Sequence, residues 1–316
     1  MYKLIGVDID GTLLRSDRAL TERTRRALHR VAETGAAVVL CTGRADFTTL
    51  SVEAQLSLPV HVICYNGALA LPPAQSSARN PLFSHTLSQD QVAQILGVAD
   101  SLHLVMNVYE FGKDFIRARV ETDDQQKLAE RFQGISKRIR YEFVADYSSV
   151  VASISPPKLI LLSNDTDAVM AELKRSTSGI NAYQESYFVD CVPASANKGL
   201  ALTKLCDILG ISVAESVAFG DGNNDVEFLT AAGLGFAMKN GEQRLKAVAD
   251  KVTAYSNDED GLAIEIEKLL DQVIMDVGST SVETYAVFFP TAIAGVALNG
   301  WILFAVYRRQ SSNSGS

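Results

Sequence analysis

Residues 4–12 read LIGVDIDGT, an apolar run that ends in two carboxylates and a glycine. A short, wholly apolar run of this kind is typical of a buried strand in a parallel sheet. Ligands of such sheets bind beyond the carboxyl ends of the strands, which is where Asp8 and Asp10 would lie. Two carboxylates so close together repel each other unless a cation or a proton joins them, and Gly11 permits the sharp turn that follows. The residues therefore predict a ligand site at this strand end, with a solvated turn as the simpler alternative.

A second acidic loop, GDGNND at residues 220–225, follows another apolar run. Asn224 or Asp225 could do no more than cap the next helix. Capping does not account for Asp221, which lies between two glycines and before the cap. This loop is therefore a second candidate for a ligand site.

The two acidic loops predict a metal site if they meet at one edge of the sheet. Asp8, Asp10 and Asp221 would then form an all-oxygen cluster, and hard oxygen ligands favour Mg²⁺ over zinc or copper. The four cysteines form no CxxC pair, so neither a zinc site nor a disulfide framework is expected.

Two further loops carry groups that suit a phosphate. Thr42, Gly43 and Arg44 follow an apolar run at residues 37–41, where a hydroxyl and backbone N–H groups could hold a phosphate and Arg44 could pair with an anion. Lys198, in the sequence NKG, opens a predicted helix and could neutralise phosphate oxygens. The alternatives are an ordinary turn with a surface arginine, and a solvated lysine.

The order of predicted elements indicates a split α/β protein. Strand and helix signals alternate in residues 1–83 and again in residues 191–274, which predicts a Rossmann-like parallel-sheet core. In residues 84–190 strand pairs and helices mix, which predicts an inserted α+β cap domain with an antiparallel sheet. Residues 183–192 are expected to form the last strand or strands of this insert.

The order of DIDGTLL, CTGR, NKG and GDGNND resembles the four motifs of the haloacid dehalogenase-like superfamily, in particular its Cof-type phosphatase branch. The similarity spans roughly residues 1–272, and YNGA at residues 65–68 and NDEDG at residues 257–261 add to it. It implies an Mg²⁺-dependent phosphatase of a small phosphorylated metabolite, such as a sugar phosphate. It also implies a large α/β cap inserted after the third strand, which is where the insert lies.

The chemistry of these residues suits an aspartyl-phosphate mechanism. Asp8 would attack phosphorus, and Asp10 would protonate the leaving alcohol and then activate water. Mg²⁺ held by Asp8, Asp221 and the Asp10 backbone carbonyl, together with Lys198, would offset the negative charge. Phosphate or substrate binding is expected of Thr42, Gly43, Arg44 and Asn66 and, by resemblance, of Asn224. Asp225, also by resemblance, would orient Lys198 or a metal-bound water.

Two other functions fit the same motifs. A phosphomutase also passes through an aspartyl-phosphate, and a catalytically silent, membrane-attached binding protein would keep only the fold. The intact acidic loops argue against the second. Substrate selection is expected from polar and aromatic cap residues, with candidates Tyr109, Glu110, Lys113, Arg117, Tyr187 and Asp190.

The C-terminal part of the chain differs from the rest. Residues 284–307 carry no charge and are mostly apolar, and at ~1.5 Å per residue a helix of this length reaches about 36 Å. A transmembrane helix is predicted there, after a linker at residues 275–283 and before a polar tail at residues 308–316. The alternative is a helix buried against a partner.

Composition sets the remaining expectations. Of 316 residues, 21% are charged and 47% apolar, as in an ordinary globular protein. The net charge of −8 and the lack of a basic block make nucleic acid an unexpected partner. Arg308 and Arg309 follow the predicted span and acidic residues precede it, so charge asymmetry alone would place the C-terminus in the cytoplasm. A reduced Mg²⁺-dependent enzyme without a signal-peptide pattern is instead expected to have its catalytic domain facing the cytoplasm, anchored by the C-terminal helix, and this orientation is favoured. The oligomeric state is not predicted.

Overall fold

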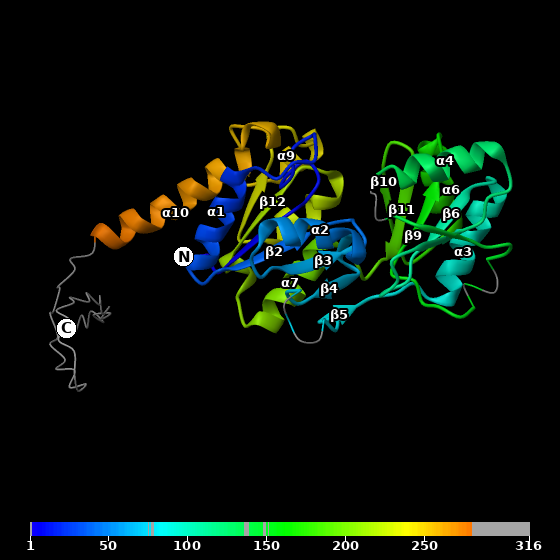
Figure 1. Ribbon diagram of the computed structural model, residues 1–316, viewed down its shortest axis with the longest axis horizontal. Coiled ribbons are helices and arrows are strands. Elements are labelled where there is room, and N and C mark those ends of the chain that lie inside the picture. Colours follow the sequence, from blue (N-terminus) through cyan, green and yellow to red (C-terminus); the bar gives the residue numbers. More distant parts are fainter. Residues whose placement is uncertain are drawn as a thin grey trace, which may run out of the picture. The chain divides into compact units, whose positions relative to one another are not determined.

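The computed structural model describes residues 2–74, 76, 79–135, 139–147, 150 and 152–279, with side chains up to residue 272 (Figure 1). The chain divides into two compact units, Met1–Lys268 and Leu269–Ser316. The first unit contains two sheets, the core sheet and the cap sheet, and all of the candidate site residues. Of the second unit, the structure describes only the end of one helix.

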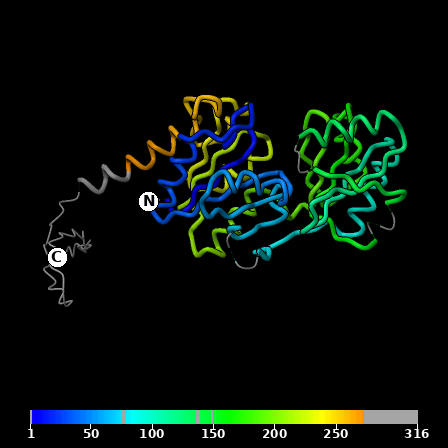
Figure 2. The backbone as a smooth tube through the Cα atoms, viewed as in Figure 1, coloured from blue at the N-terminus to red at the C-terminus, as the bar shows by residue number. Residues whose placement is uncertain are grey.

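The core sheet has eight strands, whose members in sheet order are β14 (Lys251–Val252), β13 (Leu234–Ala237), β12 (Ser216–Gly220), β1 (Leu4–Val7), β2 (Ala37–Cys41), β3 (His61–Cys64), β4 (Leu69–Leu71) and β5 (Phe83–Ser84). The strands from β14 to β3 run parallel, as predicted. β4 and β5 add an antiparallel edge that the sequence analysis did not predict. Because β1 pairs with β12, the two ends of the split core lie side by side (Figure 2).

The helices of the described chain are α1 (Glu22–Glu33), α2 (Asp46–Leu56), α3 (Gln89–Ser101), α4 (Asp123–Gln133), α6 (Thr166–Ser176), α7 (Lys198–Leu209), α8 (Val226–Ala231), α9 (Gln243–Val248) and α10 (Gly261–Ser279). Short 3-10 helices are η1 (Tyr65–Gly67), η2 (Val213–Glu215), η3 (Asn223–Asp225) and η4 (Asn257–Glu259). α7 and α8 pack their buried side chains against one face of the core sheet.

Local sequence explains why α1 and α7 begin where they do. The Thr21 side chain accepts a hydrogen bond from the Thr24 N–H, and the Asn197 side chain accepts one from the Leu200 N–H. α7 ends at Gly210, whose φ of 68° is the left-handed conformation that glycine adopts without strain. The N-cap residue Asn197 makes Lys198 the first residue of α7.

The cap sheet has six strands, in the order β10 (Ile180–Gln184), β11 (Phe188–Pro193), β9 (Leu159–Leu162), β6 (Val105–Val108), β7 (Ile116–Ala118) and β8 (Tyr141–Phe143). The predicted antiparallel sheet is correct for most pairs, but β7 and β8 run parallel. Asp190 and Asn107 both lie opposite Ile160, so these three side chains share one face of the sheet. α3 and α6 bury their apolar residues against the other face.

The structure tests only the first part of the segment that was predicted to form a linker, a transmembrane helix and a polar tail. α10 continues to Ser279, so the expected linker at residues 275–283 is helical over its first part. Within the described residues no helix is both long enough and apolar enough for a membrane span. The predicted transmembrane helix at residues 284–307 and the tail at residues 308–316 lie outside the described residues.

Candidate active site

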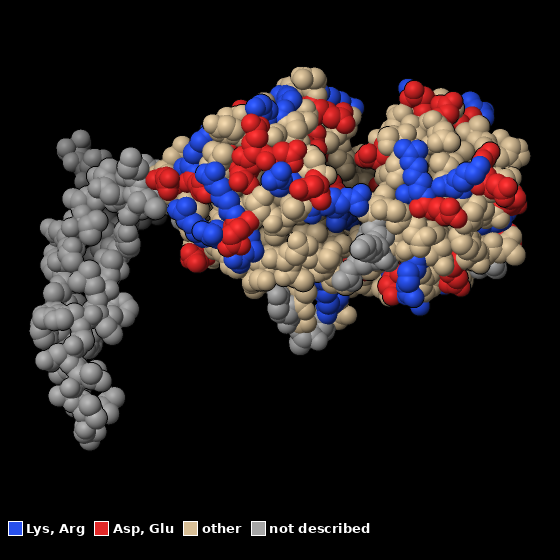
Figure 3. Space-filling model, turned by 45° about the horizontal axis from the view of Figure 1, so that its top comes forward, with Lys and Arg blue, Asp and Glu red and all other residues tan. Residues whose placement is uncertain are grey.

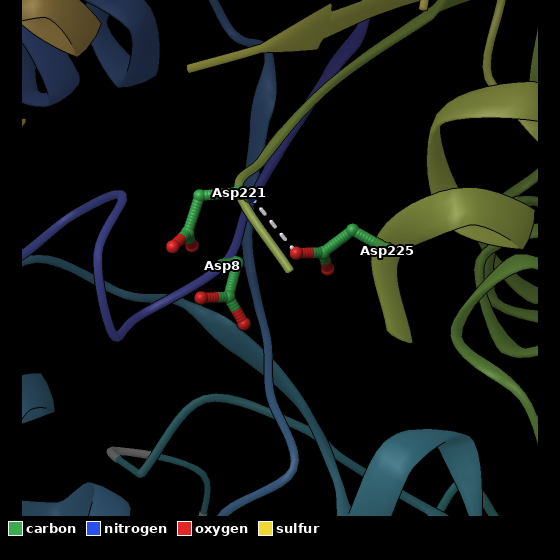
Figure 4. A group of neighbouring side chains, drawn as sticks. All are labelled: Asp8, Asp221 and Asp225. Carbon is green, nitrogen blue, oxygen red and sulfur yellow. Dashed lines mark hydrogen bonds between the residues drawn. The ribbon is translucent and has the colours of Figure 1, made fainter. Parts of the chain in front are cut away.

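Three carboxylates meet where β1 and β12 end. Asp8 follows β1, while Asp221 and Asp225 belong to the loop after β12, and one oxygen of each lies within 4.8 Å of the others. Figure 4 shows the Asp8 and Asp221 side chains next to each other, with the Asp225 carboxylate directed toward them. The Asp8 N–H donates to the Phe219 carbonyl over 2.9 Å, which continues the pairing of the parallel strands and brings their ends together. The loops therefore converge as the sequence analysis expected.

Lys198 lies between two of these carboxylates and is wholly buried. Its Nζ lies 2.6 Å from Asp8 Oδ1 and 2.6 Å from Asp225 Oδ1. Burial lowers the pKa of Lys198, but Asp225 and Asp8 outweigh burial and hold that pKa well above its ordinary value. Lys198 is therefore a fixed positive charge, held behind the Asp8 carboxylate.

One lysine does not balance the negative charge of this site. Burial raises the pKa of Asp8 well above its ordinary value, against the effect of Lys198 and with help from Asp225 and Asp221. Burial, reinforced by Asp225, raises the pKa of Asp221 from 3.8 to about 7 although Thr12 donates to Asp221 over 2.9 Å. Such shifts show that further negative charge is unfavourable here without a cation.

The residues fit a hard divalent cation. Every side-chain ligand atom that the cluster offers to a metal is a carboxylate oxygen, the ligand type that Mg²⁺ prefers. Gly11, with φ of 76°, keeps the space open, because a Cβ there would lie 2.1 Å from Asp221 Oδ2. Asp8 and Asp221 would hold the ion, together with the Asp10 backbone carbonyl. The Asp10 carboxylate is not part of the cluster, whose third member is Asp225.

Asp225 does not cap the helix that follows it. Its Oδ2 instead accepts from the Asp221 and Gly222 N–H groups, each over 3.0 Å, while Oδ1 accepts from Lys198. α8 begins without a side-chain cap. The capping alternative is therefore confirmed only for η3, where the bond from the Gly222 N–H to Asp225 is a capping-box contact, and not for α8. The contacts of Asp225 also shape the acidic loop and hold Lys198.

Asp10 and Arg44 form an ion pair at the edge of the site. Arg44 Nε lies 2.6 Å from Asp10 Oδ2, and Arg44 Nη2 lies 2.5 Å from Asp10 Oδ1. The Asp10 side chain is 58% exposed, so it is open to solvent while Asp8 is buried. Arg44, predicted to bind an anionic substrate, is thus occupied by Asp10 and orients this carboxylate.

The loop from Thr42 to Arg44 is held by an unusual turn. The Asn66 N–H donates to the Thr42 carbonyl and the Tyr65 N–H donates to the Arg44 carbonyl, each over 3.0 Å. Tyr65 and Asn66 have φ of 52° and 53°, which is rare for residues with side chains. The Arg44 N–H donates to Thr42 Oγ1 over 3.1 Å, which leaves the Thr42 hydroxyl proton free to point to a ligand.

Asn66 is held among protein groups at the site. Its Oδ1 accepts from Asn224 Nδ2 over 2.9 Å, and its Nδ2 donates to Asp190 Oδ2 over 3.0 Å. It is 1% exposed and does not line the cavity. Both ends of the Asn66 amide thus bind protein groups, and the side chain connects Asn224 to Asp190 instead of lining the cavity. Its contact with substrate stays a prediction.

A cavity of about 780 Å³ lies beside the acidic cluster and is lined by residues of the core and by residues of the segment 84–190. Its lining from the core includes Asp8, Asp10, Gly11, Thr42, Gly43, Arg44, Asp221 and Asn224, and from the cap Tyr109, Phe132, Lys158, Ile160, Tyr183, Phe188 and Asp190. On the face of the molecule drawn in Figure 3, acidic and basic side chains are interspersed.

The lining of the cavity shows which of the cap residues predicted to select the substrate lie at the site. Tyr109 and Asp190 line it, whereas Glu110 and Arg117 form an ion pair with each other over 2.6 Å and do not. Lys158 was missed. The sequence did contain a signal for Lys158 as a site residue, because it is a lone charge at the start of the apolar run KLILL.

Comparison with known proteins shows the family to which the chain is similar. A family model described as haloacid dehalogenase-like hydrolase matches residues 5–266. The 5-amino-6-(5-phospho-D-ribitylamino)uracil phosphatase YwtE of Bacillus subtilis is 31% identical, over 85% of this chain and 98% of its own length. A solved haloacid dehalogenase-like hydrolase from Bacteroides thetaiotaomicron is 28% identical and superposes with a TM-score of 0.73, covering 85% of this chain and 100% of that structure.

These findings and the site define the class of protein, an enzyme that hydrolyses phosphoric monoesters. The chain belongs to the haloacid dehalogenase-like hydrolase family.

Proposed function

We propose that the protein is an Mg²⁺-dependent phosphatase of a small phosphorylated metabolite and acts through an aspartyl-phosphate on Asp8. The observation that carries this proposal is the position of Asp8, buried at the end of β1, 2.6 Å from Lys198 and facing the cavity. A bound Mg²⁺ would supply positive charge that lets an anionic carboxylate approach an anionic phosphate.

The reaction has two steps, each with a role for Asp10. Asp8 attacks phosphorus as the bond to the leaving oxygen breaks, and Asp10 donates a proton to that oxygen. Water then attacks the aspartyl-phosphate, Asp10 takes its proton, and phosphate leaves with Asp8 restored. Asp10 lines the cavity, and its ion pair with Arg44 fixes the position of the carboxylate. Because an ion pair favours the ionised carboxylate, the contact with Arg44 would open when Asp10 carries the proton that it donates.

Three groups are proposed to bind the transferring phosphoryl group. The Thr42 hydroxyl, the Gly43 N–H and the Asn224 amide all belong to residues that line the cavity. Asn224 is held in place by its hydrogen bond to Asn66. Lys198 and Asp225 act behind the nucleophile, where Asp225 fixes the lysine that neutralises Asp8.

Residues 84–190 are proposed to act as a cap over a core of residues 1–83 and 191–274, and to select the leaving group. The lining from the cap combines the aromatic rings of Tyr109, Phe132 and Phe188 with the charges of Lys158 and Asp190. This mixture suits a leaving group with polar substituents on a carbon frame, such as a sugar. The relative YwtE is named for a ribitylamino-uracil phosphate, which has such groups.

The proposed activity is tested by incubating the purified chain with an aryl phosphate and with a panel of phosphorylated metabolites. We expect phosphate release that requires Mg²⁺ and stops in EDTA. Isomerised substrate without phosphate release would instead indicate the phosphomutase, and no turnover of any substrate would favour the silent binding protein.

Mg²⁺ is expected to stabilise the fold, and more so at high pH. In EDTA the Asp221 carboxyl, with its pKa raised from 3.8 to about 7, keeps a proton that the unfolded chain has lost, so the contribution of Asp221 to stability falls as pH rises between these values. Saturating Mg²⁺ at about pH 8 should raise Tm by about 5 °C or more. The shift should be smaller at about pH 5.5, because protons compete with the metal. Thermal unfolding with Mg²⁺ or EDTA checks this, and an equal shift at both pH values would contradict it.

Asp10→Asn should slow turnover most for poor leaving groups. Loss of a general acid costs about 10²–10⁴-fold, and an alkoxide needs the proton more than a nitrophenolate does. The measurement compares kcat/KM for an alkyl and an aryl phosphate, with Asp17→Asn, an exposed carboxylate on the same loop, as the control. Equal losses for both substrates would argue against a general acid.

We further propose, from sequence alone, that residues 284–307 anchor the protein in a membrane with the enzyme facing the cytoplasm. Carbonate-resistant membrane association that disappears on truncation after Ile274 is the expected result. Full extraction of the intact chain by carbonate would contradict the anchor.

A further inference from the structure

The proposed phosphate-binding loop is held from two sides. Of its three carbonyls, those of Thr42 and Arg44 accept backbone N–H groups of the turn at Tyr65 and Asn66 in the core. The Gly43 carbonyl between them accepts from Lys158 Nζ over 2.9 Å. Lys158 precedes β9 of the cap sheet, so the cap completes the hydrogen bonding of this loop.

Lys158 is built into its position. It is 4% exposed, its Nζ lies 3.1 Å from Asp190 Oδ2, and the ammonium lies 5.0 Å from the centre of the Tyr109 ring. Asp190 Oδ2 also accepts from Asn66, which in turn accepts from Asn224. A continuous series of contacts thus joins the cap pair Lys158–Asp190 to both proposed phosphate-binding loops.

We propose that Lys158 is a positioning residue that sets the orientation of the phosphate-binding loop when the cap is in place, a role that rests on the proposed function. The peptide that follows Gly43 presents its carbonyl to Lys158 and its N–H, on Arg44, to Thr42 Oγ1. A cation at the carbonyl polarises this peptide and strengthens the N–H donor. The Thr42 oxygen is then engaged as an acceptor, so its proton is directed to the phosphoryl group. Cap position and phosphate binding are thereby coupled.

The variant that tests this role is Lys158→Met, which keeps the length of the side chain without its charge. We expect kcat/KM for an aryl phosphate to fall by about 10- to 100-fold, since small displacements of a positioning group have effects of this size. The inhibition constant of orthovanadate, which adopts the geometry of a transferring phosphoryl group, should rise in parallel. This constant does not depend on the fraction of folded enzyme, so a loss of stability alone would not change it. Lys174→Met, an exposed lysine on α6, is the matched control.

A double variant separates loop positioning from neutralisation of Asp190. Lys158→Met leaves a buried carboxylate without its cation and could fail to fold for that reason. Lys158→Met/Asp190→Asn removes both charges, and we expect it to fold while keeping the weakened vanadate inhibition. Restoration of wild-type kcat/KM and vanadate inhibition in the double variant would overturn the proposal, because Lys158 would then serve only to neutralise Asp190.

Measurements on the wild-type protein distinguish a failure of the proposed role of Lys158 from a failure of the proposed phosphatase function. If the wild type hydrolyses the aryl phosphate and both Lys158 variants match it in kcat/KM and vanadate inhibition, the role of Lys158 is wrong while the proposed function stands. A wild type that neither hydrolyses the aryl phosphate nor binds vanadate contradicts the proposed function, and the role of Lys158 with it.

Discussion

Asp8→Asn is expected to abolish turnover, with a loss of at least ~10⁴-fold in kcat, as removal of a covalent nucleophile typically produces. The amide has nearly the same shape as the carboxylate but is a poor nucleophile. The fold should survive, because Asn removes one of several crowded negative charges from a site where burial already raises the pKa of Asp8. The measurement is kcat for an aryl phosphate together with Tm. Asp207→Asn, on the exposed side of α7, is the control.

Residual Mg²⁺-dependent hydrolysis near the wild-type rate in Asp8→Asn would exclude Asp8 as the nucleophile. A variant that does not fold would show instead that Asp8 is structural. Circular dichroism and the Mg²⁺-dependent shift in Tm separate these outcomes, since Asp221 and the Asp10 carbonyl keep part of the proposed metal site.

Lys198→Met should have the second largest effect, on both activity and stability. Its ammonium lies 2.6 Å from oxygens of Asp8 and Asp225, and the side chain is wholly buried. Removal leaves two buried carboxylates without their cation, which costs about 3–5 kcal/mol of folding free energy. Loss of the charge behind the nucleophile should also lower kcat/KM by about 10³-fold, the size of other electrostatic contributions.

Comparison with a second variant resolves the two effects of Lys198. Lys198→Met/Asp225→Asn removes one of the unpaired charges and should recover part of the stability without recovering activity. Lys204→Met, an exposed lysine on the same helix, should match the wild type. Near-wild-type kcat/KM in folded Lys198→Met would show that Lys198 has only a structural role.

The convergence of the acidic loops could be predicted from sequence for a local reason. β1 and β12 are uninterrupted apolar runs, and each is followed directly by aspartate and glycine. Since neighbouring parallel strands end at one edge, Asp8 and Asp221 had to lie close together once the two strands paired. Helix caps at Thr21 and Asn197 likewise depend on residues within one turn.

The contacts between core and cap were not predictable in the same way. Asn66 and Asp190 are 124 residues apart, and Lys158 and Gly43 are 115 apart, so no local pattern joins them. The pairing of Arg44 with Asp10 was missed because either side chain could equally bind a ligand. Local signals were also weak elsewhere. β4 and β5 are too short to show a strand period, and the apolar residues of α2 form no single stripe.

The central claim is that Asp8 accepts the phosphoryl group, and trapping the phosphoenzyme tests it most directly. Asp10→Asn should accumulate the intermediate from an aryl phosphate, because the proposed base for its hydrolysis is gone. Acid quenching, borohydride reduction and peptide mass spectrometry then locate the modified residue. We predict reduction of the Asp8 side chain, dependent on both substrate and Mg²⁺. Modification at another residue, or turnover with no phosphoenzyme at any time, would contradict the account.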